Sequence, residues 1–175
     1  MGLLRNRGGD GDAGGGSRYQ MREKLLSIGD DYWIEDDDGN RAFRVDGKAL
    51  RVRQTFVIED AAGNEVAKIQ ERKLSVRDKM AIERGGNSVA TVKKALVGLR
   101  DRFSIDLDNG GELKAKGNIV DHEYEVERDG STIATVSKRW FRVRDTYGVE
   151  IEPGEDAGLI LAITVCVDAM TDRVD

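Results

Sequence analysis

The segment Val143-Arg-Asp-Thr-Tyr-Gly-Val-Glu150 is the last of six copies of a short pattern that decides the fold of this chain. Each copy has an aliphatic residue, two or three polar residues, an aromatic residue or Met, an aliphatic residue and an acid, and the copies start 21 to 24 residues apart. The apolar positions alternate within a copy, which is typical of a half-buried β-strand. The other five copies are Ile28-Gly-Asp-Asp-Tyr-Trp-Ile-Glu35, Val52-Arg-Gln-Thr-Phe-Val-Ile-Glu59, Val76-Arg-Asp-Lys-Met-Ala-Ile-Glu83, Leu99-Arg-Asp-Arg-Phe-Ser-Ile-Asp106 and Val120-Asp-His-Glu-Tyr-Glu-Val-Glu127.

A turn sequence follows each copy, as in Asp38-Gly-Asn40 and Asp129-Gly130, because Gly, Asn and Asp adopt positive φ at little cost. Five of the turns lead into return strands that also resemble one another. With a first strand in Arg18-Tyr-Gln-Met-Arg-Glu-Lys-Leu-Leu26, the predicted strands number twelve. The return strands are Arg41-Ala-Phe-Arg-Val45, Glu65-Val-Ala-Lys-Ile69, Ser88-Val-Ala-Thr-Val92, Glu112-Leu-Lys-Ala-Lys116 and Thr132-Ile-Ala-Thr-Val136.

A run of antiparallel hairpins predicts a closed barrel, because closure removes the exposed edges of the sheet. Twelve strands leave a lumen that is too wide for strand side chains alone to fill. The sixth unit has no return strand and continues as an apolar run, Ala157 to Val167. The β-branched residues Ile163-Thr-Val-Cys-Val167 favour a strand there, but the lack of alternation and the empty lumen favour a helix. The sequence therefore predicts an all-β fold with one helix: a closed twelve-stranded antiparallel β-barrel of six hairpin repeats around a central hydrophobic helix at about residues 155–170.

Composition divides the chain into a Gly-rich tail, residues 1–17, which we expect to be disordered, and a single domain, residues 18–172. The net charge of -5 disfavours a nucleic-acid partner. The single cysteine, Cys166, lies in the apolar run and allows no intramolecular disulfide, which fits a reducing compartment. The start of the chain does not have the pattern of a signal peptide, and the longest apolar run is shorter than the roughly 20 residues of a membrane-spanning helix. We expect a cytoplasmic protein that acts peripherally at the membrane.

The repeated Val-Arg-Asp-x-aromatic-x-Val-Glu strands, the start Tyr19-Gln-Met-Arg-Glu-Lys24 and the terminal segment Asp156 to Met170 resemble the LURP-one-related family. The resemblance covers roughly residues 18 to 172. It implies a barrel similar to the tubby C-terminal domain, which is compared with phospholipid scramblases. Tubby domains bind phosphatidylinositol bisphosphate through basic residues, so the resemblance implies lipid binding as a hypothesis. It implies the fold more directly than the activity, because one fold hosts many functions.

The sequence predicts no catalytic residues, no metal site and no cofactor. One histidine and one buried cysteine do not supply the usual nucleophile and base pairs or a histidine-rich zinc site. His122 lies beside Asp121 and Glu123 on the polar side of a predicted strand, and we interpret it as an ordinary surface residue. The segment Asp36-Asp-Asp-Gly-Asn40 resembles the start of a calcium loop, but no terminal Glu stands at the required spacing, which favours an acidic hairpin turn.

The two ends of the predicted barrel differ in charge. A meander places the hairpin turns, which are strongly acidic, at one end and the connections between units, which are basic, at the other. Lys138-Arg-Trp-Phe-Arg142 mixes cations with aromatic residues, as a site for an anionic membrane or a phosphate ligand would. The candidate ligand-binding residues, here named the basic end, are Arg72, Lys73, Lys93, Lys94, Lys138, Arg139, Trp140 and Arg142.

An alternative interpretation of the basic end is structural. Its apolar residues, among them Leu50, Leu74, Leu96, Trp140 and Phe141, would then plug the mouth of the barrel while the Lys and Arg stems extend around them.

The leading functional hypothesis is a non-enzymatic binding module whose basic end contacts an anionic phospholipid headgroup or a similar ligand. The alternative is an intracellular protein-interaction scaffold that uses the acidic end and the N-terminal tail, and whose binding survives neutralisation of the basic end. A third possibility, an enzyme with a carboxylate site, requires acids that converge in a pocket, and the sequence offers no preferred pair.

Overall fold

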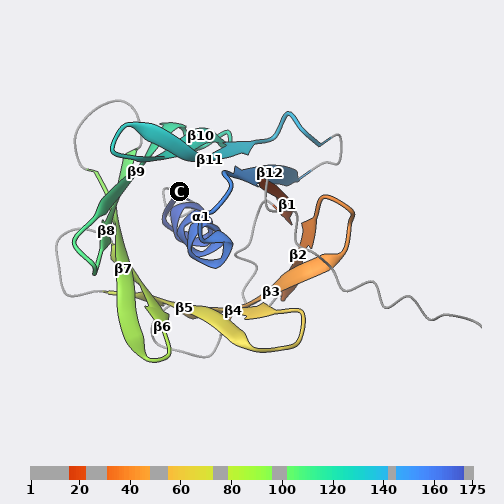
Figure 1. Ribbon diagram of the computed structural model, residues 1–175, viewed down its shortest axis with the longest axis horizontal. Helices are drawn as coiled ribbons and strands as arrows, with labels where there is room; N and C mark the ends of the chain where they lie inside the picture. Colours follow the sequence, from red (N-terminus) through yellow and green to blue (C-terminus); the bar gives the residue numbers. More distant parts are fainter. Residues whose placement is uncertain are drawn as a thin grey trace, which may run out of the picture.

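The structure is a computed structural model that describes residues 16–22, 31–47, 55–72, 79–95, 102–141 and 145–171. In this part of the chain, twelve strands form one closed antiparallel barrel around a single helix (Figure 1). The helix is α1 (Ala157–Thr171). The strands are β1 (Ser17–Arg22), β2 (Tyr32–Asp36), β3 (Arg41–Gly47), β4 (Thr55–Asp60), β5 (Glu65–Glu71), β6 (Lys79–Arg84), β7 (Asn87–Lys94), β8 (Arg102–Leu107), β9 (Glu112–Asn118), β10 (Glu123–Arg128), β11 (Ser131–Ser137) and β12 (Thr146–Ile151).

The first strand closes the barrel. β1 pairs with β12 from Ser17 opposite Ile151 to Arg22 opposite Thr146, and on its other side it pairs with β2. Every other strand pairs with its neighbours in sequence. The predicted twelve-stranded barrel with a central helix is confirmed. Residues 1–15 of the predicted tail lie outside the described residues, so its disorder stays a prediction, and Ser17 already belongs to β1.

An acidic residue ends each of the first two outward strands, β2 and β4, and helps to form the hairpin turn that follows. In the first two hairpins, the Oδ1 atom of Asp36 accepts a hydrogen bond from the backbone N–H of Asn40 at 2.8 Å, and Asp60 does the same with Asn64 at 2.9 Å. The backbone hydrogen bond from Asn40 lowers the pKa of Asp36, and the side-chain and then the backbone hydrogen bonds from Asn64 lower the pKa of Asp60. In both turns the glycine before the asparagine has positive φ. The segment Asp36 to Asn40 is thus a hairpin turn whose first carboxylate is bound within the turn.

The fifth copy of the repeat differs from the prediction at its start. β10 begins at Glu123, and the three residues before it belong to a turn in which the backbone N–H of His122 donates to the carbonyl of Ile119 at 3.1 Å. Val120, the first residue of this copy, is 62% exposed. Ile119 is buried in its place. The apolar alternation therefore marks the strand only from Tyr124 onward.

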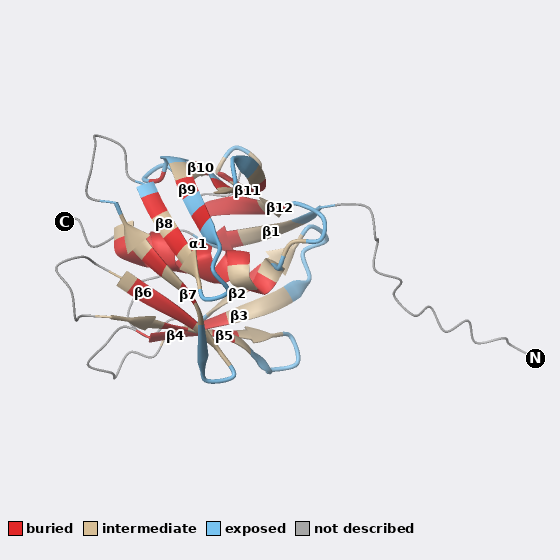
Figure 2. Cartoon of the chain, turned by 60° about the vertical axis from the view of Figure 1, so that its left-hand side comes forward, coloured by how far each residue is buried: buried red, intermediate tan, exposed pale blue. Residues whose placement is uncertain are grey.

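Helix α1 fills the lumen. Figure 1 shows the helix inside the ring of strands, and Figure 2 shows it as mostly buried. Twelve of its 15 residues are buried, and the core that includes them draws side chains from strands around the whole barrel. The hairpin tips, in contrast, are exposed (Figure 2). The β-branched residues are helical here because packing on every side outweighs their weak strand preference. No helix in the described ranges is long and apolar enough to cross a membrane.

Charged contacts attach the start of α1 to the hairpin end of the barrel. Asp156 caps the helix, because its Oδ1 atom accepts from the backbone N–H of Leu159 at 3.0 Å. The same carboxylate takes two hydrogen bonds from the guanidinium of Arg84, and Arg128 donates to Glu155 at 2.7 and 2.9 Å. Together these contacts fix the point at which the chain turns from β12 into the lumen.

The start of α1 also needs a glycine. A Cβ atom on Gly158 would lie 2.6 Å from the Cγ1 atom of Val66, so only glycine lets the first turn approach β5 this closely.

Substitution of Asp156 tests whether its contacts with Arg84 and Leu159 attach the start of α1 to the barrel. The Arg84 guanidinium lowers the pKa of its carboxyl group, so the stabilisation is present above the ordinary range of Asp and is lost as the pH falls through the lowered pKa. At about pH 7 we expect Asp156→Ala to lower the free energy of unfolding by about 1 kcal/mol or more, as for the loss of a helix cap. Urea unfolding followed by circular dichroism measures this.

Asp156→Asn is the matched control, because asparagine also caps a helix but cannot form the ion pair. Its difference from the native chain should be smaller and should shrink as the pH falls from about 5 to 2. A difference that grew in acid would contradict the account.

Candidate functional site

The described residues of the basic end lie at or just after the ends of three different return strands. Arg72 follows β5, Lys93 and Lys94 end β7, and Lys138 to Trp140 follow β11. In an antiparallel barrel these positions lie at one end, opposite the hairpin turns. Lys73 and Arg142 lie outside the described residues. The structure therefore places the described candidates at one end of the barrel, but on separate connections.

Two of these cations are bound to acids on neighbouring strands. The guanidinium of Arg72 donates to the carboxylate of Glu83 at 2.9 Å, and the ammonium of Lys93 forms an ion pair with Asp106. Arg139, in contrast, has a side chain that is 83% exposed, and its Nε atom lies 3.7 Å from an Oε atom of Glu123. Arg139 is thus the most exposed of these three cations, and its ion pair with Glu123 is longer than the contacts that Arg72 and Lys93 make with acids on adjacent strands.

Trp140 and Phe141 pack against the outer wall of the barrel. The lumen-facing residues of β12 are Tyr147 and Val149, so Gly148 between them faces outward. A Cβ atom on Gly148 would lie 2.5 Å from the ring of Trp140 and 2.7 Å from the ring of Phe141. The interpretation that these two aromatic residues plug the mouth of the barrel is therefore wrong. They pack on the outer face of β12, where the lack of a side chain at Gly148 leaves room for both rings.

Trp140 also has a cation on its ring. The guanidinium carbon of Arg18 lies 4.8 Å from the ring centroid, and Arg18 also donates to Glu150 at 2.9 Å. This arrangement holds the Trp140 ring against β1 and β12. The other apolar candidates, Leu50, Leu74 and Leu96, lie outside the described residues.

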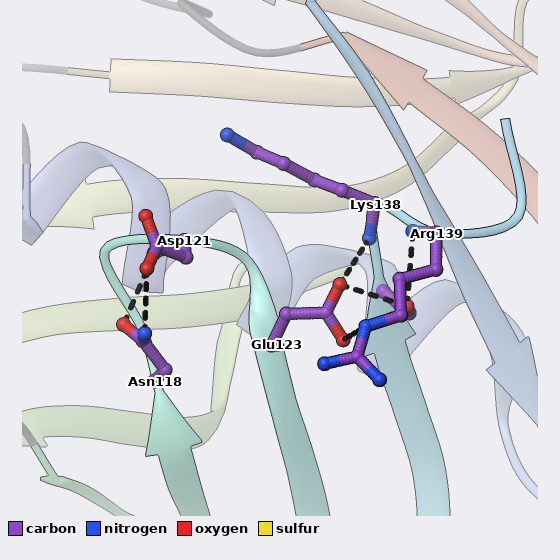
Figure 3. A network of polar contacts seen from close by, with 6 residues as sticks. Asn118, Asp121, Glu123, Lys138 and Arg139 are labelled. Carbon is purple, nitrogen blue, oxygen red and sulfur yellow. Dashed lines mark hydrogen bonds and ion pairs between the residues drawn. The ribbon is translucent and has the colours of Figure 1, made fainter. Parts of the chain in front are cut away.

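The turn that carries Lys138 and Arg139 is held by Glu123 (Figure 3). The carboxylate of Glu123, at the start of β10, accepts from the hydroxyl of Ser137 at 2.9 and 3.0 Å and from the backbone N–H of Lys138 at 3.0 Å. The Ser137 hydroxyl in turn accepts from the backbone N–H of Arg139 at 3.1 Å. The sequence does not reveal Glu123, because its partners are about 15 residues away and meet it only through the β10–β11 pairing.

His122, interpreted from the sequence as a surface residue, lies instead at the mouth of the lumen. Its side chain is 14% exposed, and its Nε2 atom lies 3.2 Å from the Oδ1 atom of the buried Asp168 in α1. The ring stacks on Tyr147 with 4.3 Å between centroids, and the Tyr147 hydroxyl donates to the other oxygen of Asp168. Two signals point to this contact: His122 stands two residues before the lumen-facing Tyr124, and Asp168 is an acid in an apolar helix.

The backbone of His122 has positive φ, 52°. This conformation is unusual for a residue with a side chain.

Three tyrosines surround Asp168 inside this end of the lumen. Burial, and then the nearby Asp168 carboxylate, raise the pKa of Tyr32 and Tyr124 well above the ordinary value, and the same causes act on Tyr147. These phenols therefore stay protonated and can only donate hydrogen bonds or accept them as neutral groups. Among the described residues, the Asp168 carboxylate therefore lies near three neutral tyrosine hydroxyls at this end of the lumen.

The model of a protein family described as LURP-one-related matches residues 17–168, which is most of the chain. The chain belongs to the LURP-one-related family. Its domain is also similar in structure to a protein from Arabidopsis thaliana, At5g01750, solved by X-ray crystallography, with a TM-score of 0.67 and 19% identity over 88% of this chain and 91% of that one. At this identity the likeness shows the fold alone. The search of curated proteins returned no match.

The described residues of this LURP-one-related domain include neither an activated cysteine nor a cluster of metal ligands. Burial raises the pKa of the Cys166 thiol far above its ordinary value, so the thiolate needed for nucleophilic attack is not formed. In the described part of the chain no three His, Cys, Asp or Glu side chains are placed to hold a metal ion. The exposed side chains at this end of the LURP-one-related barrel carry both signs of charge, with Arg139 among the cations and Asp121 among the acids.

The contact between Tyr147 and Asp168 should stabilise this LURP-one-related domain. Tyr147→Phe removes the hydroxyl that donates to the buried carboxylate, and we expect the free energy of unfolding to fall by about 1–3 kcal/mol, as for an acceptor left without its donor. Chemical denaturation at about pH 7 measures the loss.

Tyr32→Phe is the matched control. The hydroxyl oxygen of Tyr32 is also buried but has no hydrogen-bond partner among the described residues. Its removal should change the stability by no more than about 0.5 kcal/mol. Equal losses in the two variants would show that the hydrogen bond to Asp168 contributes nothing specific.

Proposed function

We propose that this LURP-one-related domain is a non-enzymatic binding module that contacts an anionic phospholipid headgroup through the turn after β11. The observation that carries the proposal is the exposed Arg139, which stands next to Lys138 on a turn where the backbone N–H of Arg139 donates to the buried Ser137 hydroxyl. The backbone of a turn that is already ordered loses little conformational freedom when it binds an anion. The expected place of action is the cytoplasmic face of a membrane, where the lipids are anionic.

The charge distribution supports a domain that faces the membrane with its basic end. The hairpin end carries Asp36, Asp60 and Glu155, whereas Lys94, Lys138 and Arg139 lie at the other end. An asymmetric field of this kind would turn the basic end toward an anionic surface and the acidic end away from it.

Aromatic insertion contributes little in this proposal. Trp140 and Phe141, the aromatic residues of the turn, are packed against Gly148 on the barrel wall. Binding should therefore be mainly electrostatic and should weaken as the salt concentration rises.

Flotation with vesicles tests the proposal. The native chain should float with vesicles that contain phosphatidylinositol phosphates in phosphatidylcholine, and not with phosphatidylcholine alone. Changing Lys138 and Arg139 together to Ala should weaken binding roughly thirty-fold, because each basic residue near an anionic surface contributes about 1 kcal/mol.

The matched control is the double change of Arg72 and Lys93 to Ala. It removes the same charge from the same end, but from residues already paired with Glu83 and Asp106, and it should weaken binding much less. Equal losses in the two double variants would contradict a role for the turn after β11. Absence of flotation with every vesicle would reject lipid binding and favour a protein-interaction scaffold.

A further inference from the structure

The Glu123 carboxylate occupies a cradle of hydrogen-bond donors on the turn after β11 (Figure 3). The Ser137 hydroxyl lies 2.9 and 3.0 Å from its two oxygens, and the backbone nitrogen of Lys138 lies 3.0 Å from one of them. The Nε atom of Arg139 lies 3.7 Å from the other. A hydroxyl, a backbone N–H and a guanidinium that converge on one point are the donors with which proteins bind a phosphate.

The donors differ from the carboxylate in how firmly they are held. Ser137 is 5% exposed, ends β11, and accepts from the backbone N–H of Arg139, so its position is fixed by the fold. The Glu123 side chain is 27% exposed and the Arg139 side chain is 83% exposed, so both can move into solvent without disturbing the core. The Ser137 hydroxyl is therefore held rigidly by the fold, whereas the Glu123 carboxylate that it binds belongs to a side chain that can move away.

We infer that Ser137, the Lys138 backbone N–H and Arg139 form a phosphate-monoester site that the Glu123 carboxylate closes in the free protein. A bound phosphate takes the place of the carboxylate, which swings out to solvent. This inference rests on the proposed function, in which the phosphate belongs to a lipid headgroup, and it names the atoms that bind it. Because Glu123 competes for the same donors, it lowers the apparent affinity and makes binding depend on a high local density of phosphate.

Inorganic phosphate is the direct probe. In a titration followed by ¹⁵N–¹H NMR, the amide resonances of Lys138 and Arg139 should shift. In Glu123→Gln these shifts should saturate at an about tenfold lower phosphate concentration, because the competing charge is gone while the amide oxygen still accepts from the turn. Unchanged resonances elsewhere in the spectrum show that the variant is folded.

Asp121→Asn tests whether the loss of any negative charge near the turn, rather than that of Glu123 itself, raises the phosphate affinity. Asp121 lies two residues before Glu123 and carries the same charge, but it is bound to Asn118 and not to the turn after β11 (Figure 3). Its neutralisation should change phosphate affinity by no more than about twofold, because exposed charges are screened. Adding Ser137→Ala to Glu123→Gln should cancel the tenfold gain.

Each outcome decides the inference. Equal gains in Glu123→Gln and Asp121→Asn, a loss of affinity in Glu123→Gln, or a gain that survives Ser137→Ala would overturn it. The lipid proposal fails separately, when Glu123→Gln binds inorganic phosphate more tightly but neither it nor the native chain floats with phosphatidylinositol phosphate vesicles. In that case the site takes a soluble phosphate monoester.

Discussion

The burial of α1 inside the barrel is the constraint on which the rest of this structure depends. A helix that is apolar on all sides has no stable place in water, and a twelve-stranded barrel has a lumen that its own side chains cannot fill. Each fully buried large side chain, such as Ile160, Leu161 or Ile163, contributes roughly 1.5–3 kcal/mol relative to exposure. The helix and the barrel therefore require each other.

Polar contacts set the position of the helix along the barrel axis. At the hairpin end, Arg84 and Arg128 bind the acids before the first turn, and at the other end Asp168 contacts Tyr147 and His122. Apolar packing alone does not fix such a position, because it is not directional. The contact with Asp168 also orders the connection between β9 and β10, where Glu123 follows His122. The base of the candidate site is thus continuous with the core.

The sequence predicts the barrel because its signals are local and repeated: alternation within each strand, turn residues after it, and a run without alternation at the end. The same signals do not reveal side chains whose partners are distant in sequence. The sequence does not reveal the buried contact of His122, because Asp168 is 46 residues away. It does not reveal the packing of the aromatic residues after β11 either, because their contact with Gly148 exists only in the folded barrel. The sequence predicts positive charge at the end of the barrel opposite the hairpin turns. It does not predict how exposed each cation is, because that depends on which acid the cation contacts on a neighbouring strand.

Native-state hydrogen exchange of α1 tests the mutual dependence of helix and barrel most directly. If the helix leaves the lumen only when the barrel opens, the amides of Leu161 to Val167 exchange with the same free energy as global unfolding. They should then show the same denaturant dependence as the most protected amides of β7 and β10. Exchange of the helix through a smaller opening, while the strands stay protected, would contradict the account and show that the barrel stands without its helix.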